Sequence, residues 1–230
     1  MSGEVEQILA TLRDFYGAPS KLPATEPFEE VLWDNVAYLA NDDRRSLAFR
    51  LLKEKVGTAP EAIMSAPRRT LIEIASHGIL ASTFADKIRS AAAIALQLDD
   101  LKSLANVPVA QARRVLRRFP GIGEPGADRI LLFSRLHAVP ALESNGVRVL
   151  QRLLAVNPGD SYARVYRAET ALIIVELGPD FDRLIDAYQL LRKHGQELCR
   201  RSEPRCQPCP LRERCAYYAS QRSEGSGSLA

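Results

Sequence analysis

Long apolar runs are missing from this chain of 230 residues. A membrane-spanning helix needs about 20 consecutive apolar residues, and no segment approaches that length. The chain starts with acidic residues (Glu4 and Glu6) and lacks the basic stretch followed by an apolar one that a secretory signal would show. We therefore expect an intracellular, cytoplasmic protein with no membrane partner.

Lysine is scarce relative to arginine. Six lysines accompany twenty-five arginines, and none lies between Lys102 and Lys193. The net charge of +3 is too small to imply a polyanionic partner by itself. The planar guanidinium of arginine suits bidentate phosphate contacts, although genomic base composition would give the same bias.

Strand-like alternation of apolar and polar residues is nearly absent. Apolar residues instead recur at spacings of three and four, for example in segments 31–52, 109–119 and 184–191. The pattern predicts an all-α fold of about ten short helices. We expect His194-Gly195 to end the last long helix, with glycine just past the helix end.

All four cysteines lie within seventeen residues, at Cys199, Cys206, Cys209 and Cys215. Four thiols this close in an intracellular chain favour a metal site over disulfides. Zinc sites usually combine two short cysteine pairs, whereas only Cys206 and Cys209 are closely spaced here. The spacing therefore favours a [4Fe–4S] cluster, with structural zinc, disulfides or loss of the metal as alternatives.

A glycine turn, Gly121-Ile122-Gly123, lies between two helical segments. The first helix is expected to end near Phe119 and the second to begin near Pro125. Such a turn leaves backbone N–H groups free at a helix N-terminus, where a phosphate oxygen can bind. Many pairs of helices use glycine in this way, so the turn alone is weak evidence.

Taken together, the hairpin and the C-x6-C-x2-C-x5-C spacing resemble the endonuclease III and adenine glycosylase branch of the helix-hairpin-helix DNA glycosylase superfamily. The resemblance covers roughly residues 27–215. It implies a monomer, nucleoid-associated if bacterial, whose partner is double-stranded DNA with a lesion or a mismatch.

The resemblance also implies two helical domains with the active-site cleft between them. A six-helix barrel containing the hairpin would span residues 28–137, and a cluster domain would span residues 138–217. Residues 1–27 would form an N-terminal helix packed on the cluster domain, and residues 218–230 a disordered tail.

Several residues are implied to contact DNA. Members of the superfamily present the hairpin and basic residues of the cluster loop to the DNA backbone, in contacts that depend steeply on salt. In this sequence the matching residues are Gly121, Ile122, Gly123, Gly126, Arg200, Arg201 and Arg205. The alternative is that the arginines only solvate the loop and offset the charge of the cluster.

Pro125 occupies the position where bifunctional endonuclease III enzymes carry a lysine. That lysine amine attacks the sugar as a Schiff base, and a proline has no such amine to offer. The resemblance therefore implies a glycosylase without lysine-based AP lyase activity.

Glu143 occupies the position of the catalytic aspartate of the superfamily, with Asn145 and Arg148 in register as DNA-binding residues. A fixed carboxylate there stabilises positive charge on the sugar or activates water. Glutamate has the same charge but one more methylene. The alternative is a helix N-terminal carboxylate that the helix dipole favours.

Two further residues are implied by the first helix of the barrel. Asp34 falls where adenine glycosylases carry the acid that protonates the departing base, and Tyr38 falls where a side chain wedges into the duplex. The two would share one face of a helix, one turn apart. The alternative is a surface acid beside an ordinary core aromatic.

The leading hypothesis is a monofunctional DNA glycosylase of base excision repair. A second hypothesis is a DNA-binding protein that has lost the chemistry and recognises distorted or abasic DNA. A third is a lyase with a different nucleophile, such as the N-terminal amine. The histidines at positions 77, 137 and 194 match no metal or triad spacing and are expected to be structural.

Overall fold

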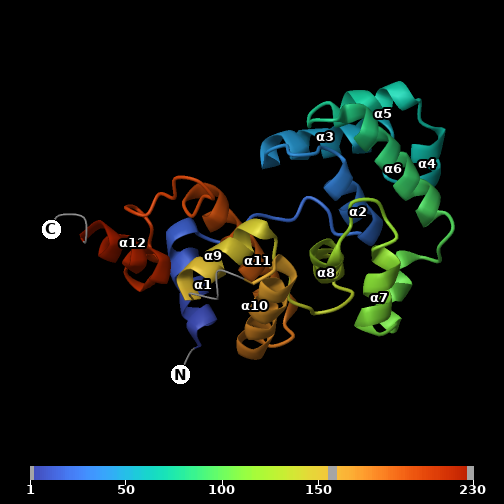
Figure 1. Ribbon diagram of the computed structural model, residues 1–230. Helices are drawn as coiled ribbons and strands as arrows, with labels where there is room; N and C mark the ends of the chain where they lie inside the picture. The colour runs from blue at the N-terminus through green and yellow to red at the C-terminus, as the bar shows by residue number, and fades with distance from the viewer. Residues whose placement is uncertain (1–2, 155–159, 227–230) are drawn as a thin grey trace. The chain divides into compact units, whose positions relative to one another are not determined.

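The computed structural model describes residues 3–154 and 160–226. These residues form twelve α-helices, two short 3-10 helices and no strand, which confirms the all-α prediction (Figure 1). None of the described helices is long and apolar enough to cross a membrane. The chain divides into a central unit, residues 22–137, and a terminal unit, residues 1–21 and 138–230.

The central unit is built from seven α-helices and one 3-10 helix. They are α2 (Pro27–Asn35), α3 (Asp42–Lys55), α4 (Pro60–Ser65), α5 (Arg68–Ala75), α6 (Ala81–Ala95), η1 (Leu101–Asn106), α7 (Val109–Leu116) and α8 (Glu124–Phe133). Helix α6 packs against α4, α5 and α2, and α8 packs against α2 and α7. This packing brings the hairpin between α7 and α8 next to α2.

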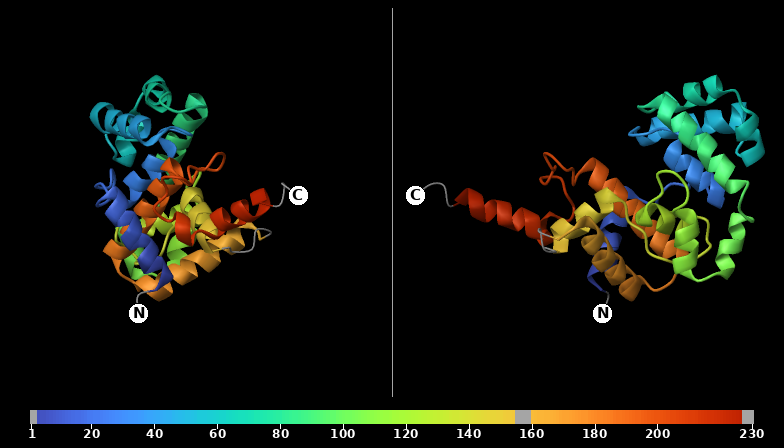
Figure 2. Two further views of the ribbon diagram at one scale, coloured as in Figure 1. Left: turned by 90° about the vertical axis from the view of Figure 1, so that its left-hand side faces the viewer. Right: turned by 45° about the vertical axis from the view of Figure 1, so that its right-hand side comes forward.

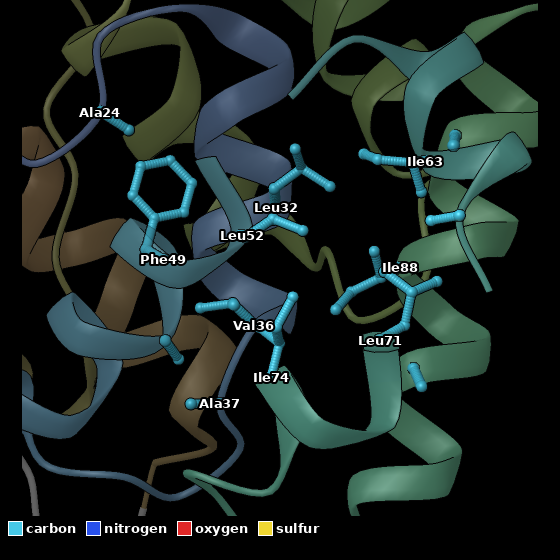
Figure 3. Packing of buried hydrophobic residues seen from close by; sticks show 14 residues of the cluster. Ala24, Leu32, Val36, Ala37, Phe49, Leu52, Ile63, Leu71, Ile74 and Ile88 are labelled. Carbon is cyan, nitrogen blue, oxygen red and sulfur yellow. The ribbon is translucent and has the colours of Figure 1, made fainter. Parts of the chain in front are cut away.

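An apolar core holds the central unit together. Side chains from α2, α3, α4, α5 and α6 point toward one another (Figure 3). The large members are Leu32, Val36, Phe49, Leu52, Ile63, Leu71, Ile74 and Ile88, each at most 3% exposed. Burial of this much apolar surface is the main force that favours the folded unit.

The terminal unit contains the first helix and the last part of the chain. Its elements are α1 (Glu4–Tyr16), α9 (Ser144–Leu154), α10 (Tyr162–Leu177), α11 (Phe181–Glu197), η2 (Arg212–Arg214) and α12 (Ala216–Ser226). Helix α11 packs against α9 and α1, and α10 also packs against α9 and α1 (Figures 1 and 2). Helix α12 packs against α9. The segments from the two ends of the chain therefore share one core.

The segment 31–52, which the apolar spacing predicts to be helical, is interrupted. Helix α2 ends at Asn35, and Leu39 adopts a left-handed φ of 52°. Asn41 then caps α3, because its side chain accepts a hydrogen bond from the Arg44 N–H at 3.0 Å. Tyr38 thus lies in a turn, and the expectation that it shares a helix face with Asp34 is wrong.

Gly195 lies inside α11, so the expectation that it ends this helix is wrong. A Cβ at Gly195 would lie 2.7 Å from the Asn145 Cβ and carbonyl oxygen. The glycine therefore allows α11 to approach α9 closely, and α11 continues to Glu197. Its end is closed when the N–H groups of Leu198 and Cys199 donate to His194 O at 3.0 and 2.9 Å.

The expectation of a disordered tail is wrong for residues 218–226, because they belong to helix α12. The helix begins directly after the last cysteine and packs against α9. One reason is that the Tyr217 ring lies under the guanidinium of Arg152 on α9, 4.5 Å from ring centre to Cζ. The remainder of that tail, residues 227–230, lies outside the described residues.

Candidate functional site

The hairpin between α7 and α8 turns at Gly121, whose φ of 80° favours glycine. Ile122 is buried, and its N–H donates to Phe119 O at 3.2 Å. Gly123 is the N-cap of α8, and its carbonyl accepts from the Ala127 N–H at 2.9 Å. Among the described residues, nothing accepts from the N–H groups of Gly121 and Gly123. The turn can therefore donate two hydrogen bonds to an anion.

Asn35, at the end of α2, positions this turn. Its side chain is buried, and its Nδ2 donates to Pro120 O and to Val31 O, each at 3.0 Å. A Cβ at Gly121 would lie 3.2 Å from Asn35 Oδ1. A larger residue at Gly121 would therefore push the turn away from α2.

Asp34 lies beside the hairpin and is held by Arg129 of α8. Its Oδ1 accepts from Arg129 Nη2 at 2.9 Å, and a Cβ at Gly126 would lie 3.5 Å from its Oδ2. One quarter of the Asp34 side chain is exposed. Since a guanidinium has donors only, Asp34 Oδ1 is the acceptor in this contact.

A second carboxylate, Glu30, shares Arg129 with Asp34. Glu30 forms an ion pair with Arg129 Nη1, and its backbone oxygen accepts from Arg129 Nη2 at 3.2 Å. Both side chains are buried, with 1% of Glu30 and 7% of Arg129 exposed. Burial raises the pKa of Glu30 to about 7, against the opposing effect of Arg129. The pair links α2 to α8 and so fixes Asp34 relative to the hairpin.

Tyr38 belongs to a ridge of exposed apolar side chains, which we call the apolar ridge. Its members are Tyr38, Leu39, Ile79 and Leu80, exposed by 38%, 70%, 52% and 59%. The ridge is built from two loops, because the Ile79 N–H donates to Tyr38 O at 3.0 Å. The Tyr38 ring stacks on Phe84, with ring centres 4.5 Å apart. Exposed apolar groups gathered in this way are typical of a binding surface.

In the terminal unit, Glu143 caps the N-terminus of α9. Its Oε1 accepts from the N–H groups of Asn145 and Gly146 at 3.0 and 3.1 Å, and its Oε2 accepts from Asn145 Nδ2 at 2.8 Å. This is the helix N-terminal arrangement that the alternative reading of the sequence describes. Each carboxylate oxygen keeps acceptor capacity beyond these bonds.

Asn145 and Arg148 connect this carboxylate to the cysteine loop. Arg148 Nη2 donates to Asn145 Oδ1 at 2.6 Å and to Gly195 O at 2.8 Å. Its Nε donates to Cys199 O at 2.9 Å. Both side chains are thus hydrogen-bonded within the terminal unit, where they fix Glu143 relative to Cys199.

The four cysteines line one cavity of the terminal unit. Cys199 follows α11, Cys206 and Cys209 lie in the loop, and Cys215 precedes α12. None of them forms a disulfide. His194 of α11 also lines the cavity, with Nε2 at 3.6 Å from Cys209 Sγ. The loop thereby gathers the four cysteine side chains around one space.

The chemistry of these thiols fits a cationic occupant. The pKa of the Cys209 thiol is raised to about 11, mainly by burial and in addition by the neighbouring cysteines. Burial also raises the pKa of Cys206, as do Cys215 and Cys199. Thiolates in this cavity repel one another, so a bound cation or cluster would favour their ionised form. Among the described residues, no three His, Cys, Asp or Glu side chains are placed to hold a single metal ion.

Three arginines of the cysteine loop are exposed and unpaired. They are Arg200, Arg201 and Arg205, whose guanidinium groups form no hydrogen bond or ion pair within the described part of the chain. In contrast, Arg212 donates to Glu213 Oε1 at 2.8 Å, and Arg214 donates to Gln7 Oε1 at 3.0 Å. Three guanidinium groups therefore remain available for phosphates.

Comparisons with known proteins agree with this geometry. No protein-family model matches the chain. Endonuclease III of Sulfolobus acidocaldarius is 26% identical over 193 residues, which cover 83% of this chain and 82% of that protein. Adenine DNA glycosylase of Arabidopsis thaliana is 34% identical over 107 residues, 45% of this chain and only 16% of that protein. A trapped covalent complex of endonuclease III with DNA has the same fold, with a TM-score of 0.74 at 19% identity, covering 96% of this chain and 99% of that one.

The chain belongs to the helix-hairpin-helix DNA glycosylase superfamily. Within the superfamily it falls in the endonuclease III and adenine glycosylase branch, as the cysteine spacing and the hairpin predict. The fold is that of endonuclease III, and the two motifs lie in separate units of it.

Several residues near the glycosylase motifs escaped the sequence analysis. Arg129 and Glu30 are 99 positions apart, and no local pattern pairs them. Leu39 and Leu80 adopt left-handed φ angles that are uncommon for leucine. The short aliphatic run after Gly78, between two helical segments, was the available signal for the apolar ridge.

Proposed function

We propose that this chain is a DNA glycosylase of base excision repair that hydrolyses the N-glycosidic bond of a damaged or mispaired base in duplex DNA. The observation that carries the proposal is Glu143, whose carboxylate is fixed at the N-terminus of α9 in a chain with the hairpin and the cysteine loop. Endonuclease III and adenine DNA glycosylase are among its relatives.

DNA would be held by both units. In the central unit, the free N–H groups of Gly121 and Gly123 would bind a phosphate oxygen, with Ile122 and Gly126 shaping the turn. Tyr38 and the rest of the apolar ridge would fill the space left by an extruded base, since apolar side chains stack between base steps. In the terminal unit, Arg200, Arg201 and Arg205 would contact the phosphate backbone.

Glu143 would stabilise the transition state of bond cleavage. The bond between the base and the sugar breaks and its electron pair leaves with the base, so that positive charge develops on the sugar. A water oxygen then bonds to the anomeric carbon, and the proton that this water loses ends on the departing base. A carboxylate held by three donors is a fixed negative charge that needs no reorganisation at that moment. Asn145 and Arg148 would act on this carboxylate as positioning residues.

Asp34 would act beside the hairpin through Oδ2, the carboxyl oxygen that Arg129 does not hold. Our first expectation places it as the acid that protonates the departing base. Its Oδ1 accepts from Arg129 Nη2, so Oδ2, on the side of Gly126, is the oxygen that would carry the proton of such an acid.

Lysine-based strand cleavage is not part of the proposed activity. Pro125 lies in the first turn of α8, where bifunctional relatives of this fold would carry the nucleophilic lysine. Lys102, the lysine that precedes it in the chain, is ion-paired with Glu26 at 2.8 Å. A secondary nucleophile such as the N-terminal amine belongs to Met1, which lies outside the described residues.

The four cysteines would hold a [4Fe–4S] cluster. Four thiols around one cavity, none in a disulfide, fit a group with four iron sites. A bound cluster would supply a rigid crosslink between the end of α11 and the start of α12. Iron, sulfide and zinc analysis of the purified protein distinguishes this cluster from structural zinc.

The central test is base release from duplexes that carry alkylated, oxidised, deaminated or mismatched bases, followed by alkali to cleave abasic sites. We expect release from at least one duplex, and Glu143→Gln should reduce its rate by about 100-fold or more. Glu176→Gln is the matched control, because Glu176 also accepts from helix N–H groups, those of Val5 and Glu6. It should leave base release unchanged.

One observation favours the second hypothesis, a DNA-binding protein without the chemistry. Both candidate carboxylates are engaged, Glu143 with α9 and Asp34 with Arg129. Tight, salt-sensitive binding to abasic or distorted DNA, with no release in the panel and no effect of Glu143→Gln, would replace the glycosylase proposal by this one. Borohydride trapping of the protein on abasic DNA would instead reveal an amine nucleophile.

A further inference from the structure

Arg152, in the last turn of α9, contacts both ends of the cysteine loop. Its Nη1 lies 3.5 Å from Cys199 Sγ and donates to Arg200 O at 2.6 Å, and its Nη2 donates to Arg201 O at 3.1 Å. Its backbone oxygen lies 3.7 Å from Cys215 Sγ. One residue thus touches the first and the last cysteine.

Tyr217, two residues after Cys215, covers Arg152 from the side of α12. The Arg152 Cζ lies 4.5 Å from the centre of the Tyr217 ring, a distance typical of a cation–π contact. Both side chains are half-buried. The hydrogen bonds to backbone carbonyls fix the guanidinium, and the fixed guanidinium in turn orients the ring.

These two residues separate two spaces of different character. On one side is the cavity that the four cysteines line. On the other is an open groove of about 850 Å³ between α9 and α12, whose walls include Ser144, Gln151 and Tyr162. Arg152 and Tyr217 are the residues that line both spaces. They therefore form the wall between the thiols and the solvent in the groove.

We propose that Arg152 and Tyr217 form a shield that keeps water and oxidants in the α9–α12 groove away from the group bound by the four cysteines. The proposal rests on the [4Fe–4S] cluster of the proposed function. Arg152 additionally donates a charge-assisted N–H···S bond to the Cys199 thiolate. Both are positioning residues, because neither supplies a ligand to the cluster.

The two residues contribute in different ways. Hydrogen bonds to the sulfurs and exposure to solvent set the reduction potential and stability of a cluster. Loss of the Arg152 guanidinium removes a positive charge and a donor, which lowers the reduction potential because the oxidised cluster is then favoured. Loss of the Tyr217 ring opens a passage from the groove without changing the charge.

The experiment compares loaded wild-type protein with Arg152→Gln, Arg152→Lys, Tyr217→Ala and Tyr217→Phe. Iron and sulfide per chain are measured first, without oxygen. The rate at which the brown absorbance is lost in air-saturated buffer is then recorded, and the reduction potential is measured by voltammetry. Circular dichroism identifies any variant that fails to fold.

A second pair of residues in the same segment provides a matched control. The Arg212 Cζ lies 5.8 Å from the centre of the Tyr218 ring, so this pair also forms a cation–π contact. Neither residue lines the cysteine cavity. Arg212→Gln and Tyr218→Ala change the same residue types at almost the same place in the chain.

We expect Tyr217→Ala and Arg152→Gln to lose the cluster about tenfold faster in air than the wild type does. Tyr217→Phe, which keeps the ring, should behave as the wild type, and Arg152→Lys should be intermediate. The control variants should stay within about twofold of the wild type. Arg152→Gln should lower the reduction potential, whereas Tyr217→Ala and Tyr218→Ala, which change no charge, should leave it unchanged.

The experiment distinguishes failure of the shield proposal from failure of the proposed cofactor. If the wild type takes up iron and sulfide but Tyr217→Ala loses them at the wild-type rate, the shield is wrong while the cluster stands. If the wild type takes up no iron and sulfide, the proposed cofactor is wrong. Should Arg152→Gln not fold, Tyr217→Ala alone decides, because it leaves every hydrogen bond of Arg152 in place.

Discussion

In the central unit a buried guanidinium lies between two carboxylates, whereas in the terminal unit a buried carboxylate lies without a partner. Arg129 pairs with Glu30 and Asp34. Glu169 of α10 is 2% exposed, and neither of its carboxylate oxygens has a hydrogen-bond partner among the described residues. His194, also 2% exposed, has its pKa lowered to about 4 by burial.

This difference indicates how each unit is stabilised. A buried charge opposes folding unless a partner compensates its desolvation. The central unit has that compensation and a continuous apolar core. The terminal unit carries the buried Glu169, which has no hydrogen-bond partner among the described residues, and a cavity lined by four thiols that no protein group bridges. We infer that the terminal unit depends on the group bound by its cysteines, and the central unit does not.

Loss of that group should have the largest effect. Cys199→Ser combined with Cys206→Ser, or removal of iron by a chelator, should destabilise the terminal unit by several kcal/mol, because binding energy at such sites is folding energy. Limited proteolysis with mass spectrometry should then find new cleavage in residues 138–226 while residues 22–137 remain protected. Equal cleavage of both units would contradict the difference between them.

Loss of the buried ion pair of the central unit should cause the next largest loss of stability. Arg129→Met leaves Glu30 buried without its partner and should lower the free energy of unfolding by about 3 kcal/mol. The double variant Glu30→Met with Arg129→Met should recover most of that loss. Arg68→Met is the control, because Arg68 pairs with Asp86 at the surface, where such pairs contribute at most about 1 kcal/mol. Urea unfolding measures all three.

The features that could be predicted from the sequence are those set by contacts between residues close together in the chain. The cysteine spacing and the glycine turn are local patterns, and both indicated the superfamily to which the chain belongs. The carboxylate of Glu143 bonds to residues two and three positions later, so its capping role was also open to prediction.

Contacts between distant helices were not predictable in this way. Arg152 meets Cys199 because α9 packs against α11, and a pattern in one segment carries no information on that crossing. Gly195 was misread for the same reason, since a glycine just past a helix end and a glycine at a close helix contact look alike in sequence. The interruption of α2 and α3 at Leu39 was missed because leucine is a helix former and rarely adopts positive φ.

Glu169 provides a test of the terminal unit through pH. Burial raises its pKa from about 4.3 in the unfolded chain to about 8 in the folded one. The folded protein therefore holds a proton that the unfolded chain releases, and stability falls as pH rises from about 4.3 to about 8. Glu169→Gln should remove this loss and stabilise the protein by up to about 5 kcal/mol at pH 8.5, with little effect at pH 4.5.

The control for this measurement is Glu197→Gln, because Glu197 is exposed in the same unit. It should change the free energy of unfolding by less than about 0.5 kcal/mol at either pH. If Glu169→Gln shifts stability equally at pH 4.5 and pH 8.5, the carboxylate is not the source of the pH dependence, and the contrast with the paired Glu30 of the central unit loses its basis.

The smallest effect concerns Glu143, the carboxylate that the terminal unit holds by amide donors rather than by a guanidinium. Glu143→Ala removes the cap of α9 and should cost about 1 kcal/mol in thermal or urea unfolding. Glu143→Gln keeps an acceptor oxygen for the N–H groups of Asn145 and Gly146, so it should cost less than half as much. If stability is retained in Glu143→Gln while base release is lost, the reaction needs the charge of Glu143, whereas the cap of α9 needs only an acceptor oxygen at this position. If both variants cost the same stability and neither alters base release, Glu143 is a helix cap alone.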